Sequence, residues 1–135
     1  MPLPHLTDIV STILTTIYEH LDYGGLSLTD SDLGKICSVL VENPNVKKIG
    51  LWMNNINDEG AEHIVNLLSD PRCVLRDINL SGNNIGYYGV KKICDKLDEL
   101  EKTSGVKIKV NLRDNPGFNQ TNEPSVPRKI GYRYS

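Results

Sequence analysis

The stretch LWMNNINDEG, residues 51–60, recurs 29 residues later in the chain as LSGNNIGYYG, residues 80–89. Both copies begin with leucine, carry an Asn-Asn-Ile triplet in the middle and end with glycine. Beyond the two stretches, identical apolar residues continue to match at this offset: Ile49 with Ile78, Ile64 with Ile93, and Leu68 with Leu97. A long pattern that recurs at one offset predicts a stack of similar structural units.

The two halves of the repeated unit have different hydrophobic periods. Ile49 and Leu51 alternate with other residues, as in a short strand with one buried face. Beyond Ile56, the apolar residues have the three- and four-residue spacing of a helix, at Ala61, Ile64, Val65 and Leu68. Each unit is therefore predicted to be a strand, a turn and a helix.

This unit resembles the leucine-rich-repeat family. It fits the pattern L-x-x-L-x-L-x-x-N-x-L followed by a helix with an internal glycine, and its length is closest to the ribonuclease-inhibitor-like type. The resemblance covers roughly residues 26–118 and implies an α/β fold, a short leucine-rich-repeat solenoid. In such a solenoid a parallel sheet forms the concave side and the helices form the convex side.

The resemblance also implies a structural role for one asparagine of each pair. In such repeats the first asparagine turns inward and bonds to the backbone of adjacent turns. Those bonds satisfy peptide groups that would cost about 1–3 kcal/mol each if buried without a partner. The asparagines expected to form this ladder are Asn54, Asn83 and Asn115.

The two ends of the chain depart from the repeat. Apolar residues between Leu6 and Leu21 have helical spacing, so we expect a capping helix at the amino end. Leu26 and Leu28 predict a strand that runs into the next helix too soon, so this copy is interpreted as truncated. The domain expected over 1–118 comprises a capping helix at 4–21, a truncated repeat at 26–45, full repeats at 46–74 and 75–105, and a terminal strand at 106–118, with a flexible tail at 119–135.

Side chains that alternate with the buried strand residues are expected to line the concave face, where the resemblance places the partner-binding surface. The candidate binding residues are Lys48, Trp52, Asp77, Asn79, Ser81, Lys109, Asn111 and Arg113. Ser27 and Thr29 would join them from the truncated copy. Two interpretations of Trp52 are open: it contacts a partner, or it packs against the protein's own tail or terminal helix.

Charged residues are divided between the two predicted layers. Basic residues gather on or beside the strands, whereas the helices carry most of the acidic ones. A basic sheet side is compatible with a partner that presents carboxylates or phosphates, and the alternative is a pair of merely solvated faces.

The sequence offers little support for an enzyme. The three histidines make no metal-ligand pair at helical spacing, so no metal and no cofactor are expected. Cys37 and Cys94 fall at buried helix positions and are interpreted as small hydrophobic residues. Cys73 lies in a loop before a strand, where a reactive thiol is an open alternative.

The bulk composition bounds the class of protein. The chain has 135 residues, of which 39% are hydrophobic, which favours one domain. Its formal net charge of −2 gives no general attraction to nucleic acid. No apolar run is long enough to span a membrane, and no secretory signal is evident. An odd number of cysteines favours a reducing compartment, so a cytoplasmic location is expected.

The tail carries one short motif. Pro124 and Pro127, followed by Arg128 and Lys129, resemble a P-x-x-P ligand of domains that bind polyproline helices. Alternatively, the last residues fold back as a strand onto the open edge of the sheet.

From these patterns we expect a non-catalytic protein–protein interaction module that binds a partner protein through its concave face. The alternative is a structural or regulatory subunit of a larger assembly, including self-association or a role as a pathogen effector. Open ends of a short solenoid leave strand edges and apolar surface to be covered, which favours this second class.

Overall fold

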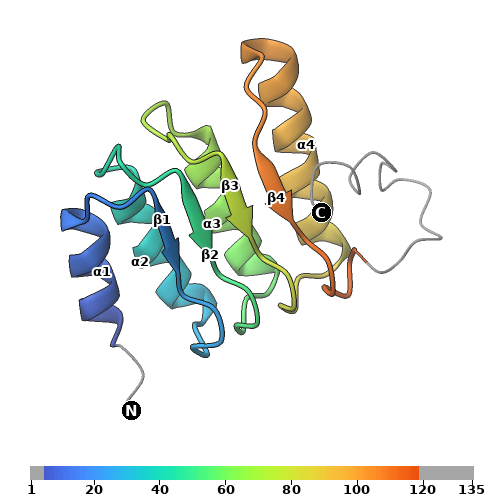
Figure 1. Ribbon diagram of the computed structural model, residues 1–135. Helices are drawn as coiled ribbons and strands as arrows, with labels where there is room; N and C mark the ends of the chain where they lie inside the picture. The colour runs from blue at the N-terminus through green and yellow to red at the C-terminus, as the bar shows by residue number, and fades with distance from the viewer. Residues whose placement is uncertain (1–4, 119–135) are drawn as a thin grey trace.

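The computed structural model describes residues 5–118, which fold into four helices and four strands in strict alternation (Figure 1). In chain order the elements are α1 (Leu6–Thr15), β1 (His20–Asp22), α2 (Asp30–Leu40), β2 (Lys48–Gly50), α3 (Asp58–Ser69), β3 (Asp77–Asn79), α4 (Tyr87–Ser104) and β4 (Lys109–Asn111).

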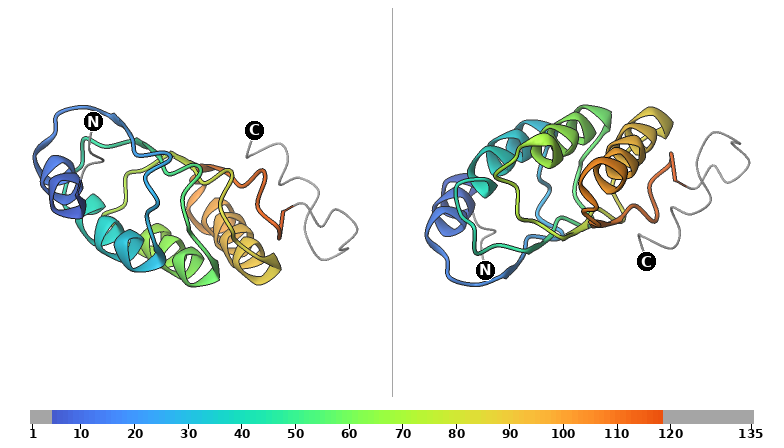
Figure 2. Two further views of the ribbon diagram at one scale, coloured as in Figure 1. Left: turned by 90° about the horizontal axis from the view of Figure 1, so that it is seen from below. Right: turned by 90° about the horizontal axis from the view of Figure 1, so that it is seen from above.

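The strands form one parallel sheet in the order β1-β2-β3-β4, so neighbours in the chain are neighbours in space. In the register of this sheet, Ile49 of β2 lies between Leu21 of β1 and Ile78 of β3. Views along the strands show the helices on one side of the sheet, as a second layer (Figure 2). The fold is therefore the predicted one, a short α/β leucine-rich-repeat solenoid.

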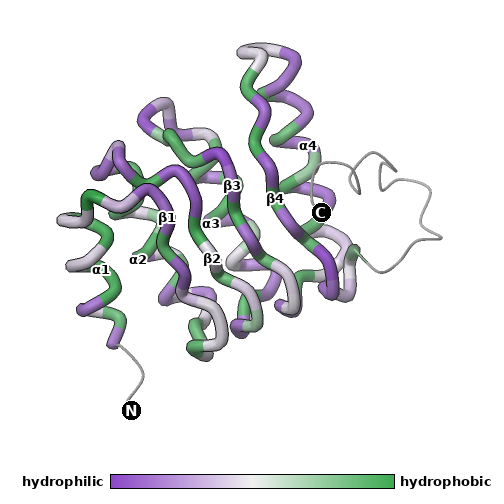
Figure 3. The backbone as a smooth tube through the Cα atoms, viewed as in Figure 1, coloured by the Kyte–Doolittle hydropathy of each residue, from purple (hydrophilic) through white to green (hydrophobic). Residues whose placement is uncertain are grey.

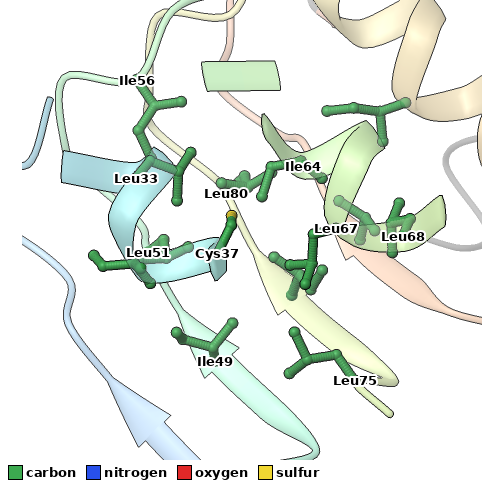
Figure 4. Packing of buried hydrophobic residues seen from close by; sticks show 14 of the residues in the cluster. Leu33, Cys37, Ile49, Leu51, Ile56, Ile64, Leu67, Leu68, Leu75 and Leu80 are labelled. Atoms are coloured by element: carbon green, nitrogen blue, oxygen red, sulfur yellow. The ribbon is translucent and has the colours of Figure 1, made fainter. Parts of the chain in front are cut away.

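The core fills the space between the two layers. Leu33 and Cys37 of α2 lie close to Leu51, the residue that follows β2, and side chains of α3 lie over the segment from Leu75 to Leu80, which contains β3 (Figure 4). Ile49 and Leu51 are fully buried. Hydrophobic and hydrophilic residues alternate along the segment that contains β4, as expected for strands with one buried face (Figure 3). Burial of each such aliphatic side chain stabilises the fold by about 1.5–3 kcal/mol.

Three buried asparagines connect the repeats. The side-chain oxygen of Asn83 accepts hydrogen bonds from the backbone N–H groups of Asn54 and Ile56, each at 3.1 Å. Its side-chain nitrogen donates to the carbonyl oxygen of Leu51 at 2.9 Å and to that of Leu80 at 3.0 Å. One side chain thus satisfies four buried backbone groups and ties its own unit to the preceding one.

Asn54 and Asn115 repeat this arrangement at the two neighbouring positions. Asn54 accepts from the N–H groups of Leu26 and Leu28 at 3.0 and 2.9 Å. Asn115 accepts from the N–H of Ile85 at 3.0 Å and donates to the carbonyl of Leu80 at 2.9 Å. The asparagines therefore lie in one line through the interior of the stack.

The predicted capping helix over 4–21 is wrong in its second half. α1 ends at Thr15, and the next residue has extended backbone angles. The buried side chain of Asn43 donates to the carbonyls of Ile13 and Thr16 at 2.7 and 2.9 Å, which satisfies groups that the helix end leaves open. Ile17, expected on the apolar side of the helix, is 81% exposed.

The first repeat is also more complete than its sequence indicates. Its strand is β1, at His20–Asp22, and not the predicted strand at 26–28. Leu26, 28 residues before Asn54, occupies the asparagine position of this unit. Among residues 5–118, only α1 lies before this unit, so this position has no strand-to-helix turn beside it to connect. The repeat pattern therefore loses its most recognisable residue here. The predicted tail at 119–135, with its P-x-x-P motif and returning strand, lies outside the described residues.

Candidate partner-binding face

The outward side chains of the sheet form three rows that run across the strands, and we call them together the sheet face. The first two rows consist of residues that are paired in the register of neighbouring strands. The third row consists of the residues two positions further along the chain from those of the second row. The rows are His20, Lys48, Asp77 and Lys109; Asp22, Gly50, Asn79 and Asn111; and Gly24, Trp52, Ser81 and Arg113.

Backbone hydrogen bonds continue the parallel pairing through the third row. The N–H of Met53 donates to the carbonyl of Ser81, and the N–H of Gly82 donates to that of Arg113, each at 2.9 Å. All eight candidate residues therefore lie on one side of the sheet. The sequence interpretation missed His20 and Asp22, because it assigned the first of them to a helix and the second to a linker.

Trp52 lies across the neighbouring strand. Its indole nitrogen donates a hydrogen bond of 2.8 Å to Oδ1 of Asp22. The same oxygen accepts from the N–H of Gly24 at 3.0 Å, which fixes the carboxylate. The indole ring lies directly against the backbone of Gly24. A Cβ atom added at Gly24 would overlap the ring, so only glycine fits at this position. Trp52 is half-buried.

Gly50 leaves room for the same contact. A Cβ atom there would lie 2.6 Å from Oδ1 of Asp22 and 3.3 Å from the indole nitrogen of Trp52. Within residues 5–118 the side chain of Trp52 contacts Asp22 and Gly24 of the preceding repeat. Contact with a partner stays a prediction, and packing against the tail lies outside the described residues. The ring packs against the adjacent repeat and keeps one surface open to solvent.

The polar side chains of the second row are held by their own backbone. Oδ1 of Asn79 accepts from the N–H and the hydroxyl of Ser81, at 3.0 and 2.7 Å. Oδ1 of Asn111 accepts from the N–H of Arg113 at 3.0 Å. These local bonds order the side chains before any partner arrives.

Charge is distributed unevenly along the sheet face. Lys48 and Asp77 form an ion pair of 3.6 Å between half-exposed side chains. Lys109 of β4 and Arg113, two residues beyond β4, are exposed. No carboxylate of residues 5–118 lies within ion-pair distance of either. The β4 end is therefore basic, whereas the β1 end carries the carboxylate of Asp22.

Ser27 and Thr29 do not belong to the sheet face. Thr29 is the N-cap of α2: its hydroxyl accepts from the N–H of Asp32 at 3.2 Å, and its own N–H donates to the Asp32 carboxylate at 3.0 Å. Both residues lie in the turn that leads from β1 to α2. The prediction for them was wrong because the strand lies earlier in the chain.

Met53 extends the apolar surface beside Trp52. Its side chain is 61% exposed, and its sulfur lies over Gly82 of the next repeat. The residue has a φ of 54°, in the left-handed region. A tryptophan and a methionine thus stand together where β2 leaves the sheet, which is the kind of apolar anchor that contributes most to protein interfaces.

Burial disfavours ionisation of two of the three thiols. Burial raises the pKa of Cys37 to about 12, and burial also raises the pKa of the half-buried Cys73. Since the thiolate is the reactive form, this argues against the reactive thiol considered for Cys73. Within residues 5–118, no group of three or more His, Cys, Asp or Glu side chains could hold a metal ion. No helix in that range is both long and apolar enough to cross a membrane.

Comparison with known proteins agrees with the internal repeat. A family model described as "Leucine Rich repeat" matches residues 42–65 and 73–94, which contain the two Asn-Asn-Ile copies. Pig ribonuclease inhibitor is 27% identical over 78 residues, 57% of this chain. Mouse ribonuclease inhibitor is 26% identical over 94 residues, 70% of this chain. These matches support a short leucine-rich-repeat protein of the ribonuclease-inhibitor-like type.

Other similar proteins share the repeat in larger contexts. Human NACHT, LRR and PYD domains-containing protein 14 is 26% identical over 98 residues, which is 72% of this leucine-rich-repeat protein and 8% of the human one. The chain spans 17% and 21% of the pig and mouse ribonuclease inhibitors.

Among solved structures, the tropomodulin C-terminal domain of Caenorhabditis elegans has a TM-score of 0.66 and 9% identity to this leucine-rich-repeat protein. That match covers 96% of this chain and 73% of the domain, and it shows the fold alone. Leucine-rich-repeat domains are generally protein-interaction modules.

Proposed function

We propose that this leucine-rich-repeat protein is a non-catalytic module that binds another protein through its sheet face. The observation that carries the proposal is the position of Trp52, which lies half-exposed among ordered polar side chains and is fixed by Asp22. Two of its relatives are, by their names, inhibitors of ribonuclease, and so act on another protein. With all three cysteines of this chain free, we place its action inside the cell.

Pre-ordering explains why such a face would bind well. Association costs about 0.5–1.5 kcal/mol for each flexible side chain that must be immobilised. Here the indole of Trp52 and the amides of Asn79 and Asn111 already have fixed partners. An aromatic anchor in the centre of an interface commonly contributes about 2 kcal/mol or more.

The proposal is tested by affinity capture from native lysate with immobilised wild-type protein and Trp52→Ala. We expect the variant to lose the captured partner while keeping the melting curve of a folded repeat. Tyr88→Ala is a matched control, because Tyr88 is an aromatic residue that is 72% exposed in the first turn of α4. Equal capture by wild type and Trp52→Ala would exclude the sheet face around Trp52 as the binding surface.

A second function is favoured by apolar surface at the amino end of the stack. Leu14, Ile17 and Tyr18 are 46%, 81% and 69% exposed, within and just after α1. As a structural subunit, the protein would cover this surface with a copy of itself or with another subunit. Sedimentation across a range of concentrations tests self-association: a concentration-dependent dimer that Ile17→Asp abolishes supports it, and a monomer throughout excludes it.

A further inference from the structure

A cavity of about 440 Å³ opens where α4 and β4 meet. It exists because α4 has 18 residues whereas α3 has 12, so the last turns of α4 continue beyond the end of the preceding helix (Figure 1). The chain then returns to β4 through residues 105–108. The lining comes from this returning segment, from the last turns of α4 and from Arg76 in front of β3.

The polar part of the lining is mainly basic. The charged residues of the described lining are Arg76, Lys107 and Lys109, together with one carboxylate, Glu101. All three cations are exposed, and none has a carboxylate of residues 5–118 within ion-pair distance. One guanidinium nitrogen of Arg76 donates to the carbonyl of Leu75 at 2.8 Å, which orients this side chain. The cavity therefore favours an anion.

The rest of the lining is apolar. Leu97 and Ile108 are 2% and 7% exposed and form part of the wall with the half-buried Val106. A free small anion would gain nothing from these side chains, whereas an aliphatic group attached to a carboxylate would bury apolar surface against them. The cavity fits a ligand with an anionic end and an apolar part.

Lys109 joins this cavity to the sheet face. It lines the cavity, and it also ends the first row of outward side chains, beside Asp77 of β3. A partner that lies across β3 and β4 therefore reaches the cavity without crossing another element.

We propose that the cavity between α4 and β4 binds an acidic peptide segment of the partner protein. Its carboxylates contact Arg76, Lys107 and Lys109, and a neighbouring aliphatic side chain packs on Leu97, Val106 and Ile108. This inference rests on the proposed function, because it names the chemistry of the partner at one end of the same face.

The charges around the cavity favour a peptide over a nucleic acid. A phosphate backbone requires a run of cations along its path, because each phosphate carries a charge. Here the adjoining helix α4 presents acidic residues within two turns of the cavity: Asp95, Asp98, Glu99 and Glu101. On the α4 side, carboxylates therefore adjoin the cations of the cavity, and the size of the cavity suits a few side chains.

The experiment is a selection from a library of random dodecapeptides on the immobilised full chain, followed by fluorescence anisotropy with the enriched peptides. We expect enrichment of sequences in which Asp or Glu stands next to Leu, Ile or Val. An absence of enrichment, or enrichment without acidic residues, overturns the proposal. Binding of a single-stranded oligonucleotide in place of the peptides overturns it as well.

Charge-reversal variants locate the binding. In Arg76→Glu/Lys109→Glu we expect the affinity for the enriched peptides to fall at least about tenfold, because two charge-assisted contacts become repulsive. Lys35→Glu/Lys92→Glu makes the same change of charge on the helix layer, and we expect it to keep the affinity. If the first variant does not fold, Arg76→Gln/Lys109→Gln replaces it. Unchanged affinity in the cavity variant overturns the proposal.

The two proposals fail separately. If Trp52→Ala loses the captured partner and the cavity variants retain acidic peptides at wild-type affinity, the sheet-face proposal stands and the cavity proposal fails. If Trp52→Ala captures the partner normally and the cavity variants lose both the partner and the acidic peptides, the binding lies at the cavity end.

Discussion

The indole nitrogen of Trp52 donates a hydrogen bond of 2.8 Å to the carboxylate of Asp22, a residue that precedes it by 30 positions on the adjacent strand. The bond joins consecutive repeats on the outside of the sheet, as Asn54 joins them on the inside. It fixes the largest side chain of the candidate interface against a glycine backbone. The protein therefore has its aromatic anchor in place before association.

Removing the acceptor should loosen that anchor. In Asp22→Ala we expect Trp52 to become more accessible, because its indole loses the hydrogen bond that holds it over Gly24. The chain has a single tryptophan, so iodide quenching of intrinsic fluorescence reports on this residue alone. Asp22→Asn keeps an acceptor oxygen and should quench as wild type does. Identical quenching in Asp22→Ala would show that the glycine contact alone positions the ring.

A side chain added at Gly24 tests the contact between the indole ring of Trp52 and the backbone beneath it. Gly24→Ala places a methyl group where the indole of Trp52 now lies, so the ring must move outward. We expect a shift of the fluorescence maximum to longer wavelength and a several-fold loss of partner affinity, with small change in stability because the site is at the surface. Gly25→Ala does not serve as a control, since its φ of 69° would strain alanine. Ser31→Ala serves instead, as a change at an exposed position in the first turn of α2, away from the ring.

The buried asparagines should carry much of the stability of the stack. Asn83→Ala leaves two N–H groups and two carbonyls without their partner, and we expect a loss of at least about 2 kcal/mol in the free energy of unfolding. Asn84→Ala changes the next residue, which is exposed, and should stay within about 0.5 kcal/mol of wild type. Urea denaturation measures both. Equal stability of the two variants would contradict the structural role of Asn83.

Because the thiol of Cys37 is buried, we expect the free energy of unfolding to depend on pH in the alkaline range. Burial raises the pKa of its thiol to about 12 from an ordinary value of 9.0, so in this interval the unfolded chain loses the proton and the folded chain keeps it. Below pH 9 the thiol is protonated in both the folded and the unfolded state, so it does not make the free energy of unfolding depend on pH. Between pH 9 and 12 the free energy of unfolding should fall by up to about 1.4 kcal/mol per pH unit from this group.

The matched variant is Cys37→Val, because Val65 occupies the equivalent position in the next repeat. We expect urea midpoints of wild type to fall faster than those of the variant between pH 9 and 11, and to run parallel between pH 6 and 8. Parallel curves throughout would mean that the thiol does not titrate differently in the two states.

The full repeats were predictable because each repeated residue has a separate physical role. Ile49 and Leu51 alternate because one side of the strand is buried, and Asn54 recurs because a side chain must satisfy the turn of each unit. The family, the two layers and the parallel sheet follow from these residues. The residues on the outward side of β2, β3 and β4 could be predicted as well, since alternation assigns residues such as Trp52 and Ser81 to the side opposite the core.

What could not be predicted lies at the two ends of the stack. At the amino end, Leu26 replaces the asparagine, and the coincident helical spacing of Ile13, Ile17 and Leu21 conceals β1. Asp22 was missed for this reason, although its partner Trp52 was recognised. A comparison at an offset of 28 residues, which aligns Leu21 with Ile49, would have revealed the strand.

At the carboxyl end, the cavity depends on repeat length. Asn115 follows Asn83 by 32 residues, three more than the spacing between Asn54 and Asn83, and the excess lies in α4 and the segment that returns from it. The excess length was visible in the sequence. The opening that it creates beside Arg76 depends on how α4 packs against α3, which periodicity does not describe.

The most direct test of the central claim follows the single indole N–H resonance of Trp52 in a ¹⁵N-labelled sample titrated with the captured partner. We predict that this resonance shifts or broadens together with the backbone amides of Ser81, Asn111 and Arg113, while the amides of α2 and α3 stay in place. An unmoved indole resonance, with changes confined to the helix layer, would contradict binding at the sheet face.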